Sequence, residues 1–311
     1  MRSRIPMRIA SLVPSATEIL FALGLGDEIV GVSPECDYPA AARGKPALSR
    51  NAIYPDSLTQ GEINGKVVQH LHDGGSLYHI DAALLEAAAP DVIFTQGLCE
   101  VCAASIGDVT SVASKLPHPP RVVSLDPTDL DGVFASIETI GRETGRERES
   151  NAIAESLRAR LLAVETETWD LERVPTVGCL EWFDPLFNAG HWVPEMVEAA
   201  GGADVLAVPG KASARIEWRD VATAAPEVVV LMPCGFSVDR AVADSKILSQ
   251  LPGWRDLPAV RRDAVFAVDA SSYFSRPGPR LIDGVEILAH ILHPDAFPRE
   301  WPQAALFRLA V

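Results

Sequence analysis

Side chains suited to holding a ligand follow the predicted strands of this chain, at the points where the strands end. Ligands bind to α/β sheets outside the carboxyl ends of the strands, so these positions are the candidates for a site. The first half of the chain contributes Pro14, Ser15, Asp37, Tyr38, Tyr78, Gln96 and Cys99. The second half contributes Glu181, Trp182, Phe183, His191, Trp192, Cys234, Phe236, Tyr273, Phe274 and Arg276. We predict that these residues form a ligand-binding site.

Aromatic rings dominate the second set, although aromatic residues make up only 6% of the chain. These rings would form one wall of the site, with Tyr38 and Tyr78 opposite. Such walls suit a large, planar or partly apolar ligand, because stacking releases water over its whole face. Some of the rings could instead fill ordinary core. Arg276 could pair with an acidic group of the ligand or cap its own loop.

The five cysteines allow two interpretations. Cys99 and Cys102 form a CxxC pair on a loop after a predicted strand, and such a pair can act in redox chemistry or bind zinc. Soft thiolates near His191 could hold zinc, copper or the metal of a cofactor. Free cysteine is also a common small buried hydrophobe. We therefore predict no firm metal site and keep Cys99, Cys102 and His191 as candidates.

Sequence motifs of enzymes are missing from the chain. It contains no hydrolase elbow, P-loop, HExxH motif or dinucleotide fingerprint. Five side chains could serve acid and base roles, but their spacing identifies no reaction: Asp37, Glu181, Asp184, His191 and Arg276. We predict that the protein binds its ligand without catalysis.

The composition limits the class of partner. The chain has 311 residues, of which 48% are hydrophobic, and a formal net charge of -15. This charge repels nucleic acid and anionic lipid surfaces. We predict a neutral, zwitterionic or cationic small molecule as the ligand, no nucleic acid, no membrane insertion and a monomeric protein.

The opening residues, Met1–Pro6, are short and polar, and the apolar run from Ile9 to Val13 has only the length of a strand. No signal peptide or membrane helix is recognisable, so the sequence as written predicts a cytoplasmic location. An odd number of cysteines fits a reducing compartment better than an oxidising one.

Short apolar runs alternate with helical patterns, which predicts an α/β fold. We expect strands at residues 8–13, 28–33, 91–96 and 121–125, and again at residues 176–180, 227–232 and 264–269. A helix is expected at residues 15–25, with Ser15 as its N-cap and Glu18 completing a capping box.

The second series of elements repeats the order of the first. Ala88–Ile93 corresponds to Ala224–Val229, because each segment combines a helix end, a proline and an apolar strand. Ser114–Pro117 and Ser249–Pro252 form a second matched pair. We predict two Rossmann-like lobes of similar design.

Residues 129–169 lie between the two halves and are predicted to be helical almost throughout. Residues 146–169 carry one apolar stripe, at Ile153, Leu157, Leu161 and Val164. A helix of about 20 residues spans about 30 Å and could join two lobes along their back. We predict domains at residues 1–128 and 170–311, with the helical connector at residues 129–169.

Several segments carry a family resemblance that covers nearly the whole chain. They are Ile9–Glu18, Gly31–Ser33, Cys36–Pro39, Ala89–Ile93, the helix at residues 146–169, Gly201–Leu206 and Ser275–Arg280. In these segments the chain resembles the class III periplasmic binding proteins of ABC importers, and among them the vitamin B12-binding type.

This resemblance implies two lobes joined by one long backbone helix, the helical-backbone metal receptor type. It implies a non-catalytic protein with no cofactor of its own, which closes on cobalamin or another corrinoid between the lobes and docks onto an ABC permease. The family is periplasmic or otherwise extracytoplasmic. Two alternatives stay open: a binder of a siderophore or haem, and a cytoplasmic metal-dependent protein that uses the cysteines. Residues 47–81 are longer than the compact loop expected there, and with His70, His72 and His79 they could cover the cleft.

Overall fold

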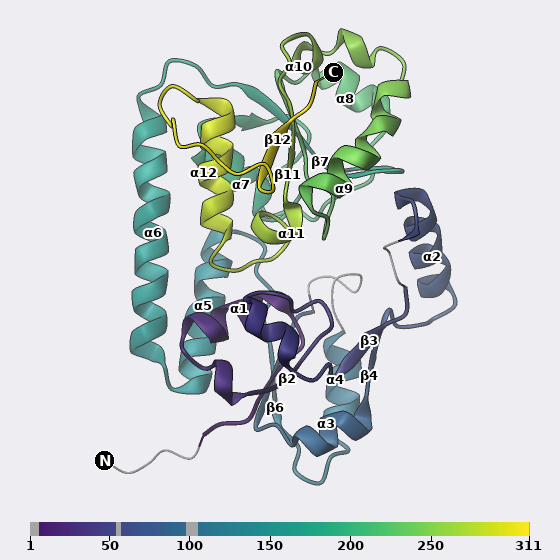
Figure 1. Cartoon of the computed structure of the whole chain (residues 1–311), viewed down its shortest axis with the longest axis vertical. Coiled ribbons are helices and arrows are strands. Elements are labelled where there is room, and N and C mark those ends of the chain that lie inside the picture. The colour runs from purple at the N-terminus through teal and green to yellow at the C-terminus, as the bar shows by residue number, and fades with distance from the viewer. Residues whose placement is uncertain (1–5, 54–56, 98–104, 311) are drawn as a thin grey trace. The chain divides into compact units, whose positions relative to one another are not determined.

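The computed structural model of the protein describes residues 6–53, 57–97 and 105–310. The chain divides into two compact units, whose elements are labelled in Figure 1. The first unit comprises Met1–Leu58, Glu62–Pro127 and Gly132–Ala154, and the second comprises Thr59–Gly61, Thr128–Asp131 and Glu155–Val311. Both units draw on the segment predicted as a connector, and the predicted limits of the domains stay a prediction.

The first unit is built on a four-stranded sheet with the order β2-β1-β5-β6, in which all neighbouring strands are parallel. Its strands are β1 (Ile9–Ser11), β2 (Ile29–Val32), β5 (Val92–Thr95) and β6 (Arg121–Ser124). The central strands β1 and β5 are buried along their whole length, which explains their unbroken apolar runs. The sequence predicts all four strands, with slightly wider limits.

Helices follow these strands in the α/β order that the sequence predicts. They are α1 (Pro14–Ala22), α2 (Gln60–His72), α3 (Ala82–Ala88), α4 (Ile106–Ala113) and α5 (Leu130–Thr144), with the short 3₁₀ helices η1 (Gly26–Glu28) and η2 (Ala40–Gly44). The predicted N-cap of the first helix is wrong. The helix begins at Pro14, and Val13 is its N-cap without a side-chain hydrogen bond. Proline suits the first helical position, because the N–H group that it lacks would have no partner there.

The long segment at residues 47–81 forms part of the first unit, except for Thr59–Gly61. Its strands β3 (Ser49–Asn51) and β4 (Tyr78–Ile80) pair antiparallel, and α2 lies between them in the chain. Leu48, Leu77 and Tyr78 join a hydrophobic cluster with residues of the main sheet, such as Ile93. The hairpin is therefore anchored in the core of this unit.

The second unit has a mixed six-stranded sheet with the order β12-β11-β10-β7-β8, and β9 also pairs with β7. Its strands are β7 (Thr176–Phe183), β8 (Leu186–Asn188), β9 (Ala203–Asp204), β10 (Val228–Leu231), β11 (Val265–Val268) and β12 (Leu306–Arg308). Strands β9, β7, β10 and β11 run parallel, whereas β8 and β12 are antiparallel to their neighbours. The carboxyl ends of β7, β10 and β11 therefore meet at one edge.

The remaining helices are α6 (Glu147–Trp169), α7 (Val193–Ala199), α8 (Trp218–Ala224), α9 (Val238–Asp244), α10 (Pro258–Arg261), α11 (Ala270–Tyr273) and α12 (Leu281–Leu292), with η4 (Ser245–Gln250) and η5 (Trp254–Asp256). Helix α6 buries one stripe that includes Leu157 and Val164. Beside it lies α12 (Figure 1), and Arg160 of α6 binds Asp283 at 2.6 Å and Glu286 at 2.7 Å. Among the described residues, no helix combines the length and apolar character needed to cross a bilayer.

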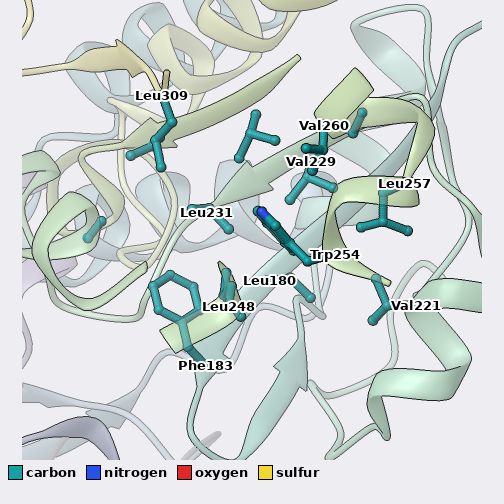
Figure 2. Close-up of a cluster of buried hydrophobic side chains, with 14 of the residues drawn as sticks. Leu180, Phe183, Val221, Val229, Leu231, Leu248, Trp254, Leu257, Val260 and Leu309 are labelled. Carbon is teal, nitrogen blue, oxygen red and sulfur yellow. The ribbon is translucent and has the colours of Figure 1, made fainter. Parts of the chain in front are cut away.

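One hydrophobic cluster forms much of the core of the second unit (Figure 2). Leu180, Val229 and Leu231, from the adjacent strands β7 and β10, are fully buried. Figure 2 shows the indole ring of Trp254 lying among such aliphatic side chains, and Trp254 is only 5% exposed. This packing fixes the sheet whose carboxyl edge carries the candidate site.

The repeated sequence pattern produces the same backbone in both units. Ala89 ends α3 with a φ of 39°, and Ala225 ends α8 with a φ of 45°. Each alanine is followed by a proline, which cannot continue a helix, and then by a fully buried strand. The predicted α/β architecture with two similar halves is confirmed.

Candidate functional site

The loops after β7, β10 and β11 are tied to one another at the carboxyl edge of the second unit. The backbone N–H of Cys234, after β10, donates to the carbonyl of Glu181 in β7 at 3.1 Å. The backbone N–H of Gly235 donates to Oγ of Ser275, after β11, at 3.2 Å. The second-half loops that the sequence singles out are therefore brought together.

An aromatic pair lies at this edge. The rings of Trp182 and Phe236 are 5.3 Å apart between centroids, with an interplanar angle of 49°. Arg240 places its guanidinium carbon 4.8 Å from the centroid of the Phe236 ring, and Phe236 is 9% exposed. Trp182 is only partly buried, and its Nε1–H donates to the carbonyl of Asp184 at 3.1 Å. Trp182 thus presents a partly exposed apolar ring, whose indole N–H is fixed by a hydrogen bond.

A register shift at Glu181 decides which ring faces the core. Side chains alternate along a regular strand, so Leu180 and Trp182 would share one face. The pairing of β7 with β8 shifts between Leu180 and Trp182. Such an irregularity re-aims the following side chains, and Phe183, not Trp182, joins Leu180 in the hydrophobic cluster. Phe183 therefore contributes to the core, while Glu181 and Trp182 stay partly exposed.

Trp192 and Phe274 form a second pair of aromatic residues, and both are buried. Their side chains are 6% and 2% exposed, and Nε1 of Trp192 donates to the carbonyl of Phe274 at 2.8 Å. This hydrogen bond satisfies the only polar group of a buried indole. The two residues tie the start of α7 to the segment after α11.

His191 precedes this buried tryptophan in a left-handed conformation, with a φ of 55°. Its ring lies 5.6 Å from the ring of Trp192, and its backbone N–H donates to the carbonyl of Lys211 at 2.6 Å. Partial burial lowers the pKa of His191 below its ordinary value. The imidazole is therefore neutral at pH 7, and a neutral imidazole can accept a hydrogen bond or ligate a metal.

Arginine side chains lie against aromatic rings at the end of α11 and in the segment before β12. The rings of Tyr273 and Trp301 are 6.3 Å apart, and the guanidinium carbon of Arg280 lies 5.9 Å from the centroid of Tyr273. Arg299 lies 4.0 Å from the centroid of Trp301. Tyr273 and Arg276 are both partly exposed. This part of the edge can offer positive charge to a ligand.

The first unit has a polar cluster after β1 and β2. Oγ1 of Thr17 lies 3.0 Å from Sγ of Cys36 and 2.8 Å from Oγ of Ser11, within hydrogen-bond distance of both, and Oγ of Ser33 lies 3.3 Å from the same sulfur. All four residues are buried, which gives this cluster a structural role. Ser15 is also buried, at 3% exposure, whereas Pro14 is partly exposed at the start of α1.

The other first-half candidates differ in exposure. Tyr38 is 45% exposed, and the neighbouring Asp37 lies 3.9 Å from the guanidinium of Arg43. Tyr78 and Gln96 are each 6% exposed, and Tyr78 belongs to the hydrophobic cluster of the first unit. Cys99 and Cys102 lie outside the described residues.

The thiols that the structure describes fit the structural interpretation of the cysteines. Cys36 and Cys179 are buried and Cys234 is partly buried. Burial, with a smaller effect of Asp204, raises the pKa of Cys179 well above its ordinary value, so this sulfur stays protonated. Within residues 6–53, 57–97 and 105–310, no group of three or more His, Cys, Asp or Glu side chains is placed to hold a metal ion.

Gln60 is a residue that sequence reasoning misses. It lies in the long segment at residues 47–81, yet it contacts Trp182, Phe183 and Asp244. No sequence signal distinguishes it from the other glutamines of the chain. A separate cavity of about 540 Å³ beside α2, lined by Ile53, Leu58 and Lys66 among others, contains none of the predicted site residues.

Comparison with known proteins places this geometry in context. A family model described as periplasmic binding protein matches residues 9–271. The chain is 25% identical over 297 residues to the uncharacterized ABC transporter substrate-binding lipoprotein YvrC of Bacillus subtilis, covering 94% of this chain and 82% of the relative. It is also 25% identical over 293 residues to the vitamin B12-binding protein of Vibrio cholerae, covering 90% of this chain and 86% of the relative. The structure resembles the periplasmic heme-binding protein RhuT from Roseiflexus sp. RS-1 in apo form, with a TM-score of 0.70 and 21% identity over 94% of this chain and 100% of that one.

Proposed function

The chain belongs to the periplasmic binding protein family, and from this premise we propose that it is the substrate-binding protein of an ABC importer with a corrinoid of the vitamin B12 type as its ligand. In this role the protein would bind its ligand without catalysis and deliver it to a permease. Its relatives include an ABC substrate-binding lipoprotein and a vitamin B12-binding protein, which supports this role.

The proposed class of ligand rests on the aromatic pair Trp182–Phe236 at the carboxyl edge of the second sheet, whose ring centroids are 5.3 Å apart. A partly exposed indole backed by a second ring offers a flat apolar surface, on which a corrin ring can stack. The net charge of -15 favours a ligand of low net negative charge, such as cyanocobalamin, over the dianionic haem.

Haem is the second candidate. The structural resemblance to a heme-binding protein shows the fold alone. The half-buried imidazole of His191 could ligate the iron of haem. The same imidazole could ligate the cobalt of a corrinoid, so it does not separate the two ligands.

Of the two locations that the sequence predicts, we propose the extracytoplasmic one. The family name and the lipoprotein relative support it. Fractionation of cells that produce the protein from its native gene would test this location, and recovery in the cytoplasmic fraction alone would contradict it.

Absorbance titration tests the ligand. We expect a saturable spectral change when cyanocobalamin is added to the purified protein, with haemin titrated in parallel. Saturable binding of haemin without any response to cyanocobalamin would replace the corrinoid by haem. Stoichiometric zinc or iron in the protein, with affinity for neither chelate, would contradict the proposed function.

A further inference from the structure

A short segment from the first half of the chain is hydrogen-bonded to Trp182, one member of the aromatic pair of the second unit. Residues Thr59–Gly61 count with the second unit, although the residues on both sides of them count with the first. Gln60, at their centre, is only 3% exposed. Glutamine is rarely buried unless its amide group is satisfied, so its partners indicate its role.

Gln60 makes three hydrogen bonds to the edge of the second unit. Its side-chain Oε1 accepts from the backbone N–H of Phe183 at 2.7 Å, and its Nε2 donates to Oδ2 of Asp244 at 3.1 Å. Its backbone carbonyl accepts from Nε1 of Trp182 at 3.2 Å. The side-chain oxygen and the main-chain carbonyl of Gln60 therefore hold the end of β7, and its side-chain nitrogen holds the end of α9.

Together with three further contacts, these hydrogen bonds form a closed ring of interactions that includes the aromatic pair. Asp244 also accepts from Nε of Arg240 at 3.0 Å. Arg240 lies 4.8 Å from the ring of Phe236, and Phe236 lies 5.3 Å from the ring of Trp182. Trp182 in turn donates its indole N–H to the carbonyl of Gln60, which completes the ring of interactions. A movement of any member disturbs the neighbours on both sides.

At position 61 the chain passes so close to Asp184 that a side chain there would displace the Asp184 carboxylate. A Cβ atom on Gly61 would lie 2.4 Å from Oδ2 of Asp184. Asp184 also supplies the second acceptor for the indole N–H of Trp182. The glycine therefore lets Gln60 reach the strand end.

We propose that Gln60 is a positioning residue for ligand binding, which holds the partly exposed Trp182 ring in the orientation used for stacking. The inference rests on the proposed function. A partly exposed tryptophan without such support samples several rotamers, and ordering it on binding lowers affinity. Because Gln60 orders the Trp182 side chain before the ligand binds, this free-energy cost is absent from binding. Gln60 can therefore determine affinity without contacting the ligand.

The first experiment compares the native protein with Gln60→Ala. Because the Phe183 amide loses its acceptor, we expect its exchange with deuterium to become about 10-fold faster. We expect the dissociation constant of cyanocobalamin to rise about 2- to 10-fold, the range for losing one pre-organised side chain. Gln69→Ala is the matched control, because Gln69 lies on the same helix and its amide bonds the exposed Asp73. This control should change neither quantity.

A second pair of variants separates positioning from a general loss of folding. Gln60→Glu keeps the acceptor for Phe183 but sets a carboxylate against Asp244, so it should also weaken binding. Exchange at the Phe183 amide should stay near the native rate in this variant, because the acceptor is kept. Gln60→Ala should change the tryptophan fluorescence of the native protein but not that of the Trp182→Phe variant.

Two results would overturn the inference. One is unchanged amide exchange at Phe183 in Gln60→Ala. The other is an unchanged dissociation constant in a native protein that does bind cyanocobalamin. If the native protein binds neither cyanocobalamin nor haemin, the proposed function fails, and the part of the inference that concerns a ligand fails with it. Exchange and fluorescence then still decide whether Gln60 holds Trp182.

Discussion

Asp204 gives the folding stability of this protein a defined pH dependence. Its Oδ1 accepts hydrogen bonds from the amides of Leu206 at 2.9 Å and Ala207 at 3.1 Å. Its Oδ2 is buried and has no hydrogen-bond partner among the described residues. Burial outweighs the two hydrogen bonds and raises the pKa of the carboxyl group from its ordinary 3.8 to about 6.

The sign of the effect follows from these two values. In the unfolded chain the carboxyl group ionises near pH 3.8, whereas in the folded protein it stays protonated up to about pH 6. Between these values the folded state binds more protons, so its stability falls as the pH rises. The loss is absent below both pKa values and complete above about pH 7. Since each tenfold change in ionisation corresponds to about 1.4 kcal/mol, the total is about 3 kcal/mol.

Asp204→Asn removes this ionisation and keeps an oxygen for the two amides. We expect the free energy of unfolding of the variant, minus that of the native protein, to increase by about 2 kcal/mol between pH 4 and pH 7. Urea denaturation followed by circular dichroism at several pH values measures it. Other carboxylates titrate in both proteins and cancel in the difference. Asp256→Asn is a control, because the Asp256 side chain is 74% exposed. A constant difference from pH 4 to pH 8 would refute the reasoning.

Three further substitutions test the site and its support. Trp182→Ala should weaken cyanocobalamin binding by about 1–3 kcal/mol if the ring stacks on the ligand, and an unchanged titration would remove the aromatic argument. Trp192→Phe keeps a buried ring but loses the hydrogen bond to the carbonyl of Phe274, so urea denaturation should show a loss of about 1 kcal/mol. Gly190→Ala would place a Cβ atom 2.2 Å from the backbone nitrogen of Ser213. We expect a loss of more than about 2 kcal/mol, and a melting temperature equal to that of the native protein would show that the loop can move aside.

Much of the fold could be predicted because its signals are local. The first strands are short apolar runs, and the αL alanines at positions 89 and 225 are each followed by a proline and a buried strand. Hydrophobic periodicity and proline stops act over a few residues, so a single sequence reveals them. The placement of candidate residues after β7, β10 and β11 follows from the same reasoning, since parallel strands share one carboxyl edge.

The sequence did not reveal which of these rings face a ligand. Phe183 and Trp182 are neighbours with similar aromatic character, and a register shift opposite β8 sends Phe183 into the core. Tyr78 likewise enters a hydrophobic cluster because its hairpin packs against the main sheet. The direction of a side chain depends on the strand that pairs with it, and that strand can be distant in the chain.

The amino-acid sequence by itself determined the alternation of strands and helices, the repeated design of the two halves and the sheet edge at which the candidate residues gather. Only the tertiary structure decided that Gln60 supports Trp182, 122 residues further along the chain. Periodicity and stop signals reflect interactions between near neighbours. The hydrogen bonds of a buried amide, in contrast, depend on which distant groups the folded chain brings within 3 Å or so of it.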